Sequence, residues 1–505
     1  MDRVIVVGAG IGGLVAALDL AVAGVAVTLL ERAATPGGKL RSATVAGRAI
    51  DAGPTVFTMR PLWEAIFAAA GTTLAAHLTL RPAGILARHA WSARERLDLH
   101  ADAAQSAEAI GDFAGAAAAR LYRDFVRQSA RLHATLDRSY MQAAAPTPLS
   151  VAAGAGLRGL GALLGMSPRA TLWQALGRYF PDPRLRQLFA RYATYCGASP
   201  FVAPATLMLI AHVERQGVWL PEGGMRTLAT ALAGLVAARG GVLRSDAAVA
   251  EIVVSHGRAR GVVLTDGERI DADAVVAATD AQALATGRFG AAAARAVPRL
   301  AAGARSLSAV TWAMLAQTDG FTLARHNVFF ADDYAAEFAA IFGQRRLPDQ
   351  PSVYVCAQDR DGGAEPAGGE RLLCLVNAPA TGDTAPPSDA EIARCERTML
   401  TRLAACGLQL RPLAQTVTGP AQFAAMFPAT GGALYGRHLD GWRASFDRPT
   451  ACSRLPGLYL AGGSVHPGPG VPMAALSGRL AAAAVLADLA SRSRSAPTPG
   501  GTSMR

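Results

Sequence analysis

The chain has 505 residues, of which 51% are hydrophobic and 17% are charged, and its formal net charge is +11 at pH 7. A chain of this length and composition can bury a large apolar core, which excludes intrinsic disorder over most of its length. The positive charge favours anionic partners. Because only 6% of the residues are aromatic and no basic block is interleaved with them, we expect a membrane surface and no nucleic acid.

The six cysteines form no Cys-x-x-Cys pair, and no cluster of metal-ligating residues is visible. This spacing indicates free thiols in a reducing compartment and no metal site. Asp2 and Arg3 lead directly into a glycine-rich motif, so no signal peptide is predicted. We therefore expect a cytoplasmic protein, and the sequence leaves its oligomeric state open.

The first thirty residues predict a strand over 4–7, a helix over 14–23 and a second strand over 25–30. The turn between the first strand and the helix has the pattern G-x-G-x-x-G and is typical of nucleotide-binding folds, in which the helix N-terminus faces a pyrophosphate. The loop consists of Gly8, Ala9, Gly10, Ile11, Gly12 and Gly13. Glu31 ends the second strand, where a carboxylate accepts hydrogen bonds from a ribose. A helix start without a ligand is the structural alternative, and the motif alone does not separate FAD from NAD.

Further along the chain, alanine- and arginine-rich sequence predicts helix from about residue 65 to 141. The glycine-rich segment 148–166 is too short and too polar for a membrane span, so it is either a segment on a membrane surface or a buried helix pair. No other stretch is expected to span a bilayer. Strands return over 241–280, with hairpin turns at 256 and 266. Residues 491–505 predict a disordered basic tail.

Two short segments after the nucleotide motif, "ERAATPGGKLRS" (31–42) and "IDAGPTVF" (50–57), resemble the flavin-dependent amine oxidase and carotenoid desaturase superfamily. The resemblance implies FAD as the cofactor and an α/β fold, with a Rossmann-like FAD-binding domain of the amine-oxidase (GR2) type and an interleaved α+β substrate domain. The FAD-binding domain is expected to be discontinuous, over 1–70, 215–285 and 440–490. The substrate- and membrane-facing domain would then occupy 71–214 and 286–439.

The resemblance also assigns cofactor contacts outside the loop. Lys39 is the only lysine in the chain, and in the superfamily a basic residue after paired glycines lies beside the FAD. A compact ammonium suits a crowded turn better than a guanidinium does, although chance is the alternative explanation. Many superfamily members carry an acidic residue where Gly463 stands, so one ribityl contact is left unassigned. The implied contacts are Arg32, Gly38, Lys39, Gly53, Pro54, Thr55, Val249, Gly462, Gly463, Gly470, Val471 and Pro472.

Three further segments, 182–205, 217–232 and 457–478, resemble bacterial carotenoid desaturases, and the first of them is most similar to the 1-hydroxycarotenoid 3,4-desaturases. The resemblance implies an oxidoreductase that desaturates an acyclic hydroxy- or methoxycarotenoid and associates peripherally with the inner or photosynthetic membrane. The alternatives are a phytoene desaturase or another carotenoid oxidoreductase and, more distantly, a flavin amine oxidase or a non-enzymatic isoprenoid carrier.

Few side chains are candidates for the chemistry itself, because the sequence has no nucleophilic triad or paired carboxylates. His466 is a possible proton acceptor in the last glycine-rich turn, and an ordinary turn histidine is the alternative. Asp137, Arg138 and Tyr140 end a predicted helix of the substrate region, where a solvated helix end explains them as well. The candidates for binding a hydroxylated substrate end are Tyr192, Thr194, Tyr195 and His212. A buried hydroxyl without a partner costs about 1–3 kcal/mol, although tyrosines packed in a core explain the pattern too.

Overall fold

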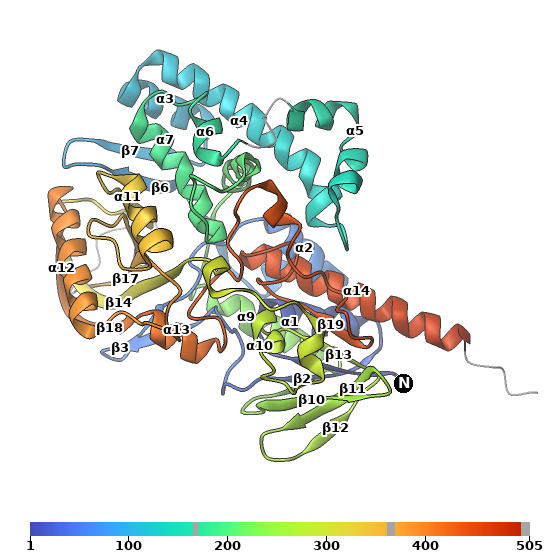
Figure 1. Ribbon diagram of the computed structural model, residues 1–505. Helices are drawn as coiled ribbons and strands as arrows, with labels where there is room; N and C mark the ends of the chain where they lie inside the picture. Colours follow the sequence, from blue (N-terminus) through green and yellow to red (C-terminus); the bar gives the residue numbers. More distant parts are fainter. Residues whose placement is uncertain (165–169, 361–368, 496–505) are drawn as a thin grey trace, which may run out of the picture.

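The computed structural model describes residues 1–164, 170–360 and 369–495. A parallel sheet of five strands in the order β19-β13-β1-β2-β9 lies in the lower part of Figure 1. Its strands come from distant parts of the sequence: β1 (Arg3–Val7), β2 (Ala26–Leu30), β9 (Val242–Arg244), β13 (Ala274–Ala277) and β19 (Leu458–Leu460). The predicted strands over 4–7 and 25–30 are thus confirmed, and so is the α/β fold class.

The alternation of side chains in β1 explains how this sheet is covered. Val4 and Val6 join a core with helices α1 (Ile11–Val22), α9 (Arg226–Ala238) and α14 (Val471–Ser495). Ile5 and Val7 join a second core, which includes residues of a three-stranded antiparallel sheet. That sheet consists of β10 (Val249–Ser255), β11 (Arg258–Leu264) and β12 (Arg269–Asp271), with turns where the sequence predicts them. Both faces of the parallel sheet are therefore buried, as such sheets require.

A second sheet of seven strands has the order β18-β14-β17-β16-β15-β6-β7. Helix α12 (Asp389–Ala405) packs on it through Cys395, Met399 and Leu403, which share a core with Trp312 of β14. The strands are β6 (Ile85–Ala90), β7 (Arg96–His100), β14 (Ser308–Asp319), β15 (His326–Phe329), β16 (Val353–Ala357), β17 (Glu370–Ala378) and β18 (Gln409–Thr418). Two small antiparallel pairs complete the β structure: β3 (Ser42–Val45) with β4 (Arg48–Asp51), and β5 (Leu80–Pro82) with β8 (Trp219–Pro221).

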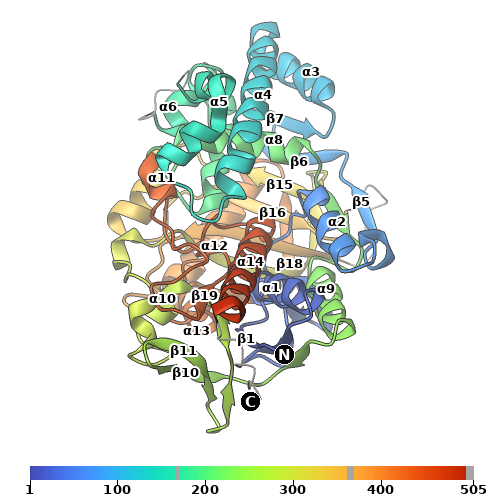
Figure 2. The same ribbon diagram turned by 90° about the vertical axis from the view of Figure 1, so that its right-hand side faces the viewer.

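A group of helices lies at the end of the molecule opposite β10–β12, as both views in Figures 1 and 2 show. They share a core with β6, β7 and β15. The group consists of α3 (Ala103–Ala114), α4 (Ala116–Leu136), α5 (Pro148–Leu164), α6 (Leu172–Leu176), α7 (Pro183–Ala190) and α8 (Leu209–Arg215). The shorter helices elsewhere are α2 (Arg60–Ala69), α10 (Ala281–Ala285), α11 (Tyr334–Phe338) and α13 (Pro420–Met426). Because the parallel sheet and the seven-stranded sheet draw on separate segments, we propose the predicted discontinuous division into two domains.

Two predictions from the sequence need correction. The continuous helix over 65–141 is wrong, because β5, β6 and β7 occupy 80–100 and gain their hydrogen bonds from β8 and β15 far along the chain. The disordered tail is wrong for 491–495, where α14 continues, and 496–505 lie outside the described residues.

In the described part of the chain, one helix, over Val471–Arg492, is long and apolar enough to cross a membrane by composition. Its residues Ala475, Ala481 and Val485 are buried in the core around α1, which accounts for that composition.

Segment 148–166 forms α5 as far as Leu164, and its last two residues lie outside the described part of the chain. Gly156 has φ +62° and breaks the helix, as the high glycine content suggests. Leu149 near its start is 84% exposed, whereas Val151, two residues further on, is buried.

Candidate functional site

The glycine-rich loop forms the predicted turn between β1 and α1. Gly8 has φ +100°, and its N–H donates to the carbonyl of Leu30 at 2.7 Å. A Cβ atom at position 13 would lie 1.9 Å from the carbonyl oxygen of Gly8, so the helix can approach the strand only with glycine there. A Cβ atom at position 10 would meet nothing within 4 Å. No side chain caps the N-terminus of α1, which leaves its first N–H groups free for an anion on the open side of Gly10.

Glu31 lies directly beside this loop. Its buried carboxylate accepts hydrogen bonds from the N–H groups of Ala9 at 2.7 Å and Ala33 at 2.9 Å. The carbonyl of Glu31 accepts from the N–H of Ala247 at 2.8 Å, which brings the start of β10 at Val249 to the same edge. The structure thus brings Glu31 and Val249 to one edge of the loop, where the resemblance implies the adenosine side of the FAD. The guanidinium of Arg32 donates to the carbonyl of Met426.

Lys39 lies in a turn that is packed against the glycine-rich loop. The N–H of Gly37 donates to the carbonyl of Ala9 at 2.9 Å, and a Cβ atom on Gly38 would lie 3.1 Å from the Cα of Gly10. The ammonium of Lys39 donates to the carbonyl of Leu434 at 2.5 Å and lies 5.2 Å from the centre of the Phe427 ring. Burial lowers its pKa, while the nearby Asp280 carboxylate raises it.

The turn at 53–55 adjoins the same lysine. A Cβ atom on Gly53 would lie 1.9 Å from the carbonyl oxygen of Lys39, so the two backbones are in contact. Pro54 is half-buried, and the hydroxyl of Thr55 shares a hydrogen bond of 2.7 Å with the phenol of Tyr354 on β16. The turn therefore connects the cofactor side of the molecule with the seven-stranded sheet.

The C-terminal glycine-rich segment closes over α1. A Cβ atom on Gly12 would lie 2.8 Å from the nitrogen of Gly462, so the two glycines allow a close approach of the backbones. Gly463 follows, and Gly470 with Val471 and Pro472 starts α14, whose N-terminus faces the same region as that of α1. The predicted glycine segments thus come together, although they lie more than four hundred residues apart in the chain.

Sequence reasoning missed Arg448, which is buried beside this segment. It donates to the carbonyls of Arg437 at 2.7 Å and Tyr435 at 3.1 Å, and burial lowers its pKa. Arg448 also contributes to the lowered pKa of Lys39, so the two cations lie close together. Two buried cations next to two helix N-termini favour an anionic ligand. No sequence pattern marks Arg448, because its position depends on three backbone carbonyls that only folding brings together.

His466 is held by backbone groups. The backbone N–H of His466 donates to the carbonyl of Pro449 at 2.8 Å. Nε2 of its ring donates to the carbonyl of Ala143 at 3.0 Å. Its ring packs edge-on against Tyr140, whose hydroxyl donates to the carbonyl of Ser445 at 2.6 Å. Burial lowers the pKa of His466, so the ring is neutral at pH 7. These contacts hold the ring in place, and Nδ1 of a neutral imidazole that donates from Nε2 keeps the lone pair that the predicted proton-accepting role requires. Of the neighbouring candidates, Arg138 is exposed and Asp137 accepts a hydrogen bond from Gln142.

We predict that His466→Gln keeps most of the activity of the FAD-loaded enzyme, because glutamine can still donate to Ala143. The turnover rate should stay within about threefold of the wild-type rate, and the Tm should fall because the ring contact with Tyr140 is lost. The measurement compares kcat and Tm of the two proteins. A drop in kcat of about 10²–10⁴-fold, typical of a lost general base, would restore the catalytic interpretation.

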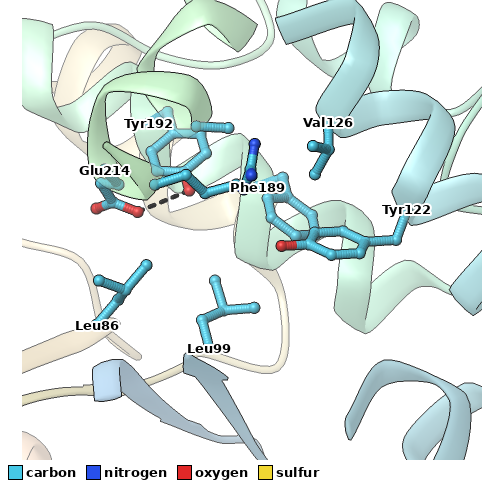
Figure 3. A pocket seen from close by; sticks show the side chains of 9 residues that line it. Leu86, Leu99, Tyr122, Val126, Phe189, Tyr192 and Glu214 are labelled. Atoms are coloured by element: carbon cyan, nitrogen blue, oxygen red, sulfur yellow. Dashed lines mark hydrogen bonds between the residues drawn. The ribbon is translucent and has the colours of Figure 1, made fainter. Parts of the chain in front are cut away.

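Two of the four substrate candidates meet on a carboxylate that the sequence analysis did not single out. The hydroxyls of Tyr192 and Tyr195 donate to Glu214 on α8 at 2.7 Å and 2.8 Å. Thr194 instead donates to the carbonyl of Arg191, and the His212 ring lies against His133 with ring centres 4.9 Å apart. Glu214 also borders a small cavity (Figure 3). One signal in the sequence could have identified Glu214: a glutamate within the largely apolar helical segment "LIAHVER".

The arrangement around the glycine-rich loop fits FAD. The open side of Gly10 and the uncapped start of α1 suit a pyrophosphate, and Glu31 suits the ribose. Lys39, the turn at Gly53 and the start of α14 would then border the rest of the cofactor. Among residues 1–164, 170–360 and 369–495, no group of three or more potential ligands lies close enough to hold a metal ion.

Comparisons with known proteins agree with this geometry. Residues 11–486 match the family of flavin-containing amine oxidoreductases. The chain is 54% identical to hydroxyneurosporene desaturase of Rubrivivax gelatinosus, over 100% of this chain and 97% of the relative. It is 47% identical to hydroxyneurosporene desaturase of Cereibacter sphaeroides, over 98% and 99% of the two chains. A crystal structure of an oxidoreductase from Methanosarcina mazei shares the fold, with a TM-score of 0.60 at 17% identity over 96% and 100% of the two chains.

Proposed function

The chain belongs to the family of flavin-containing amine oxidoreductases, and from this membership we propose that it is an FAD-dependent desaturase of an acyclic carotenoid. The observation that carries the proposal is the full-length similarity to two relatives named hydroxyneurosporene desaturase. We propose a 1-hydroxycarotenoid as the substrate and a new double bond at the 3,4-position, beside the hydroxylated end. The predicted cofactor, FAD, agrees with the family and with the cradle around Gly10 and Glu31.

Bound FAD supplies an acceptor for the hydride that leaves an sp³ carbon next to the polyene. The protein then has three tasks: to exclude water, to align a long apolar rod and to let a proton leave. The seven-stranded sheet and the helices around α4 share a large apolar core, which suits the first two tasks. Because the ring of His466 is tied to the backbone, we propose that the protein provides positioning rather than strong acid–base catalysis.

Each alternative function that the sequence left open differs from the proposed desaturase in one feature. A phytoene desaturase would not need a hydrogen-bonding site for a hydroxylated end, whereas Glu214 with its two tyrosines forms a buried acceptor. A flavin amine oxidase shares the family but would act on a small polar substrate. A non-enzymatic carrier would not need the open glycine loop beside Glu31.

We predict that the purified protein, loaded with FAD and given 1-hydroxyneurosporene in liposomes, forms a product with a longer conjugated system. The absorption maximum of the carotenoid should shift to longer wavelength, because each added double bond extends the polyene. The measurement is an absorption spectrum with chromatography of the extracted pigment. The same mixture without protein is the control. Turnover of amines with an unchanged carotenoid would support the amine oxidase, and carotenoid binding without FAD retention would support the carrier.

We further propose that the enzyme collects its insoluble substrate at a membrane surface. Leu149, Val202 and Trp442 are among the few large apolar side chains that are exposed. The N–H of Gly441 donates to the carbonyl of Val202, which places Trp442 next to that residue. The hydroxyl of Tyr140, a few residues before α5, donates to Ser445 and brings the start of α5 to the same region. Together with the net charge of +11, this apolar group favours an anionic bilayer.

We predict that the protein pellets with anionic liposomes and is released by high salt or detergent. The double variant Leu149→Asp/Trp442→Ser should weaken partitioning about tenfold or more, because two apolar side chains no longer enter the interface. Leu413→Asp is the matched control, since Leu413 is 51% exposed on strand β18 of the seven-stranded sheet. A sedimentation assay measures the bound fraction. Equal binding of both variants would contradict this membrane surface.

A further inference from the structure

Glu214 lies at the wall of a small cavity, with room for about one water molecule, between α4, α8 and the strands β6 and β7. Most of the wall is apolar: Leu86 and Leu99 come from the strands, Val126 from α4, and Phe189 from α7. Figure 3 shows the carboxylate of Glu214 and the phenol of Tyr192 side by side above the two leucines. The cavity thus combines an apolar lining with one charged acceptor.

The carboxylate is buried, with 7% of the residue exposed, and three side chains surround it. Tyr192 donates to Oε2 and Tyr195 to Oε1, and the guanidinium of Arg191 lies 3.9 Å from Oε1. Burial raises the pKa of both tyrosines well above its usual value, so both phenols stay neutral donors. A carboxylate has about four lone-pair positions, so acceptor capacity remains after these contacts.

A buried donor without a partner also lines the cavity. In the part of the chain that the structure describes, Nε of Arg215 has no hydrogen-bond partner, and neither has Nε of the adjacent Arg191. Buried polar groups are paired in most proteins, so an orphan donor next to a partly used acceptor indicates a ligand with both functions. A hydroxyl group donates one hydrogen bond and accepts others.

The polar cluster is continuous with the cofactor side of the molecule. Tyr195 and Tyr354 pack against the same apolar core, and a Cβ atom on Gly197, two residues after Tyr195, would lie 2.6 Å from the Tyr435 ring. Tyr354 shares a hydrogen bond with Thr55 in the turn beside Lys39, and Tyr435 follows Leu434, which accepts from Lys39. A 3,4-desaturation takes place close to the hydroxylated carbon, so an acceptor connected in this way to the cofactor turns is suitably placed.

We propose that the Glu214 carboxylate, held by Tyr192 and Tyr195, accepts a hydrogen bond from the terminal tertiary hydroxyl of the substrate and thereby selects hydroxylated carotenoids. The inference rests on the proposed function and names its specificity-determining residue. The hydroxyl group, which is about the size of a water molecule, occupies the cavity beside Glu214, and Nε of Arg215 donates to its oxygen. A hydrocarbon end leaves the buried acceptor and donor without partners. The free-energy cost of these unpaired groups weakens its binding, and the enzyme therefore discriminates against it.

The test compares kcat/KM of the FAD-loaded enzyme in liposomes for 1-hydroxyneurosporene, its methyl ether and the hydrocarbon neurosporene. For the wild type we expect a preference of about ten- to hundredfold for the hydroxylated compound over both others, because neither can donate to Glu214. Glu214→Gln, which replaces the charged acceptor by a neutral amide, should reduce this preference to about threefold or less. Glu337→Gln is the matched control, since Glu337 is also buried but lies outside the cavity, and it should keep the full preference.

Three outcomes separate the explanations. A Glu214→Gln enzyme that keeps its FAD and its full preference overturns the role of Glu214 alone. Equal rates of the wild type on the alcohol and its methyl ether overturn the inference even where the variant does not fold, because this comparison needs no substitution. If the wild type binds FAD and converts none of the three carotenoids, the proposed function itself is wrong.

Discussion

Gly10→Ala should reduce the affinity for FAD about hundredfold, equivalent to about 2.7 kcal/mol, and leave the fold of the apoprotein unchanged. The reason is the position of the added methyl group. A Cβ atom at residue 10 meets no protein atom within 4 Å, and the backbone there has φ −71° and ψ 174°, which alanine adopts freely. The methyl group would instead occupy the space in which the pyrophosphate approaches the start of α1. Fluorescence titration of the apoprotein with FAD measures the affinity.

The control is Gly234→Ala on α9. A Cβ atom there also meets nothing within 4 Å, and the residue lies on the exposed side of the helix, away from the loop. It should leave FAD affinity unchanged and raise stability by up to about 1 kcal/mol through helix propensity. Gly13→Ala gives the opposite pattern, since its methyl group would clash with the Gly8 carbonyl and lower the stability of the apoprotein itself. Undiminished FAD binding by Gly10→Ala would place the cofactor elsewhere.

Glu337→Gln should stabilise the protein by up to about 3 kcal/mol at pH 8.5 and change its stability little at pH 5. Burial raises the pKa of Glu337 from 4.5 to about 7, against hydrogen bonds from Ser352 and Asn377 that lower it. Between these two pKa values the folded state holds a proton that the unfolded state has released. The free energy of unfolding therefore falls as the pH rises from about 4.5 to 7, and the penalty is complete above pH 7. Glutamine removes the titration and can still accept from Ser352.

Urea titrations of the FAD-loaded protein at the two pH values measure the free energy of unfolding. Glu108→Gln is the control, because Glu108 is exposed on α3 and its replacement should change stability by less than about 0.5 kcal/mol at either pH. A loss of stability at pH 8.5 in Glu337→Gln would mean that the charged carboxylate is stabilised by the fold, and the sign of the expected pH dependence would be wrong.

Local sequence was sufficient for the nucleotide-binding half of the site. The β1–α1–β2 unit is continuous in sequence, and the glycines at 8, 10 and 13 act through backbone sterics within a few residues of one another. The expected partner of this loop, Glu31, lies directly after the next strand, so its place followed from the parallel pairing of β1 and β2. The resemblance of 457–478 to related flavoproteins added the second glycine segment, which the structure brings against Gly12.

The strands in region 80–100 show what local patterns miss. The segments of β6 and β7 lie within the alanine- and arginine-rich stretch 65–141, whose composition predicts helix. They are strands because β15, more than two hundred residues later, supplies hydrogen bonds along one edge of β6. Tertiary pairing overrides a weak propensity when it satisfies the backbone of a whole segment.

For this protein, the sequence alone determined the fold class, the nucleotide-binding turn and the family, because each depends on short-range sterics or on motifs of a few residues. Only the tertiary structure decided the partners of the buried polar groups. Glu214 lies in an apolar helix, and nothing in its neighbourhood along the chain shows that Tyr192 and Tyr195 donate to it. The same holds for Arg448 among backbone carbonyls. A buried charge must find its partners in space, and their identity is set by how distant segments pack.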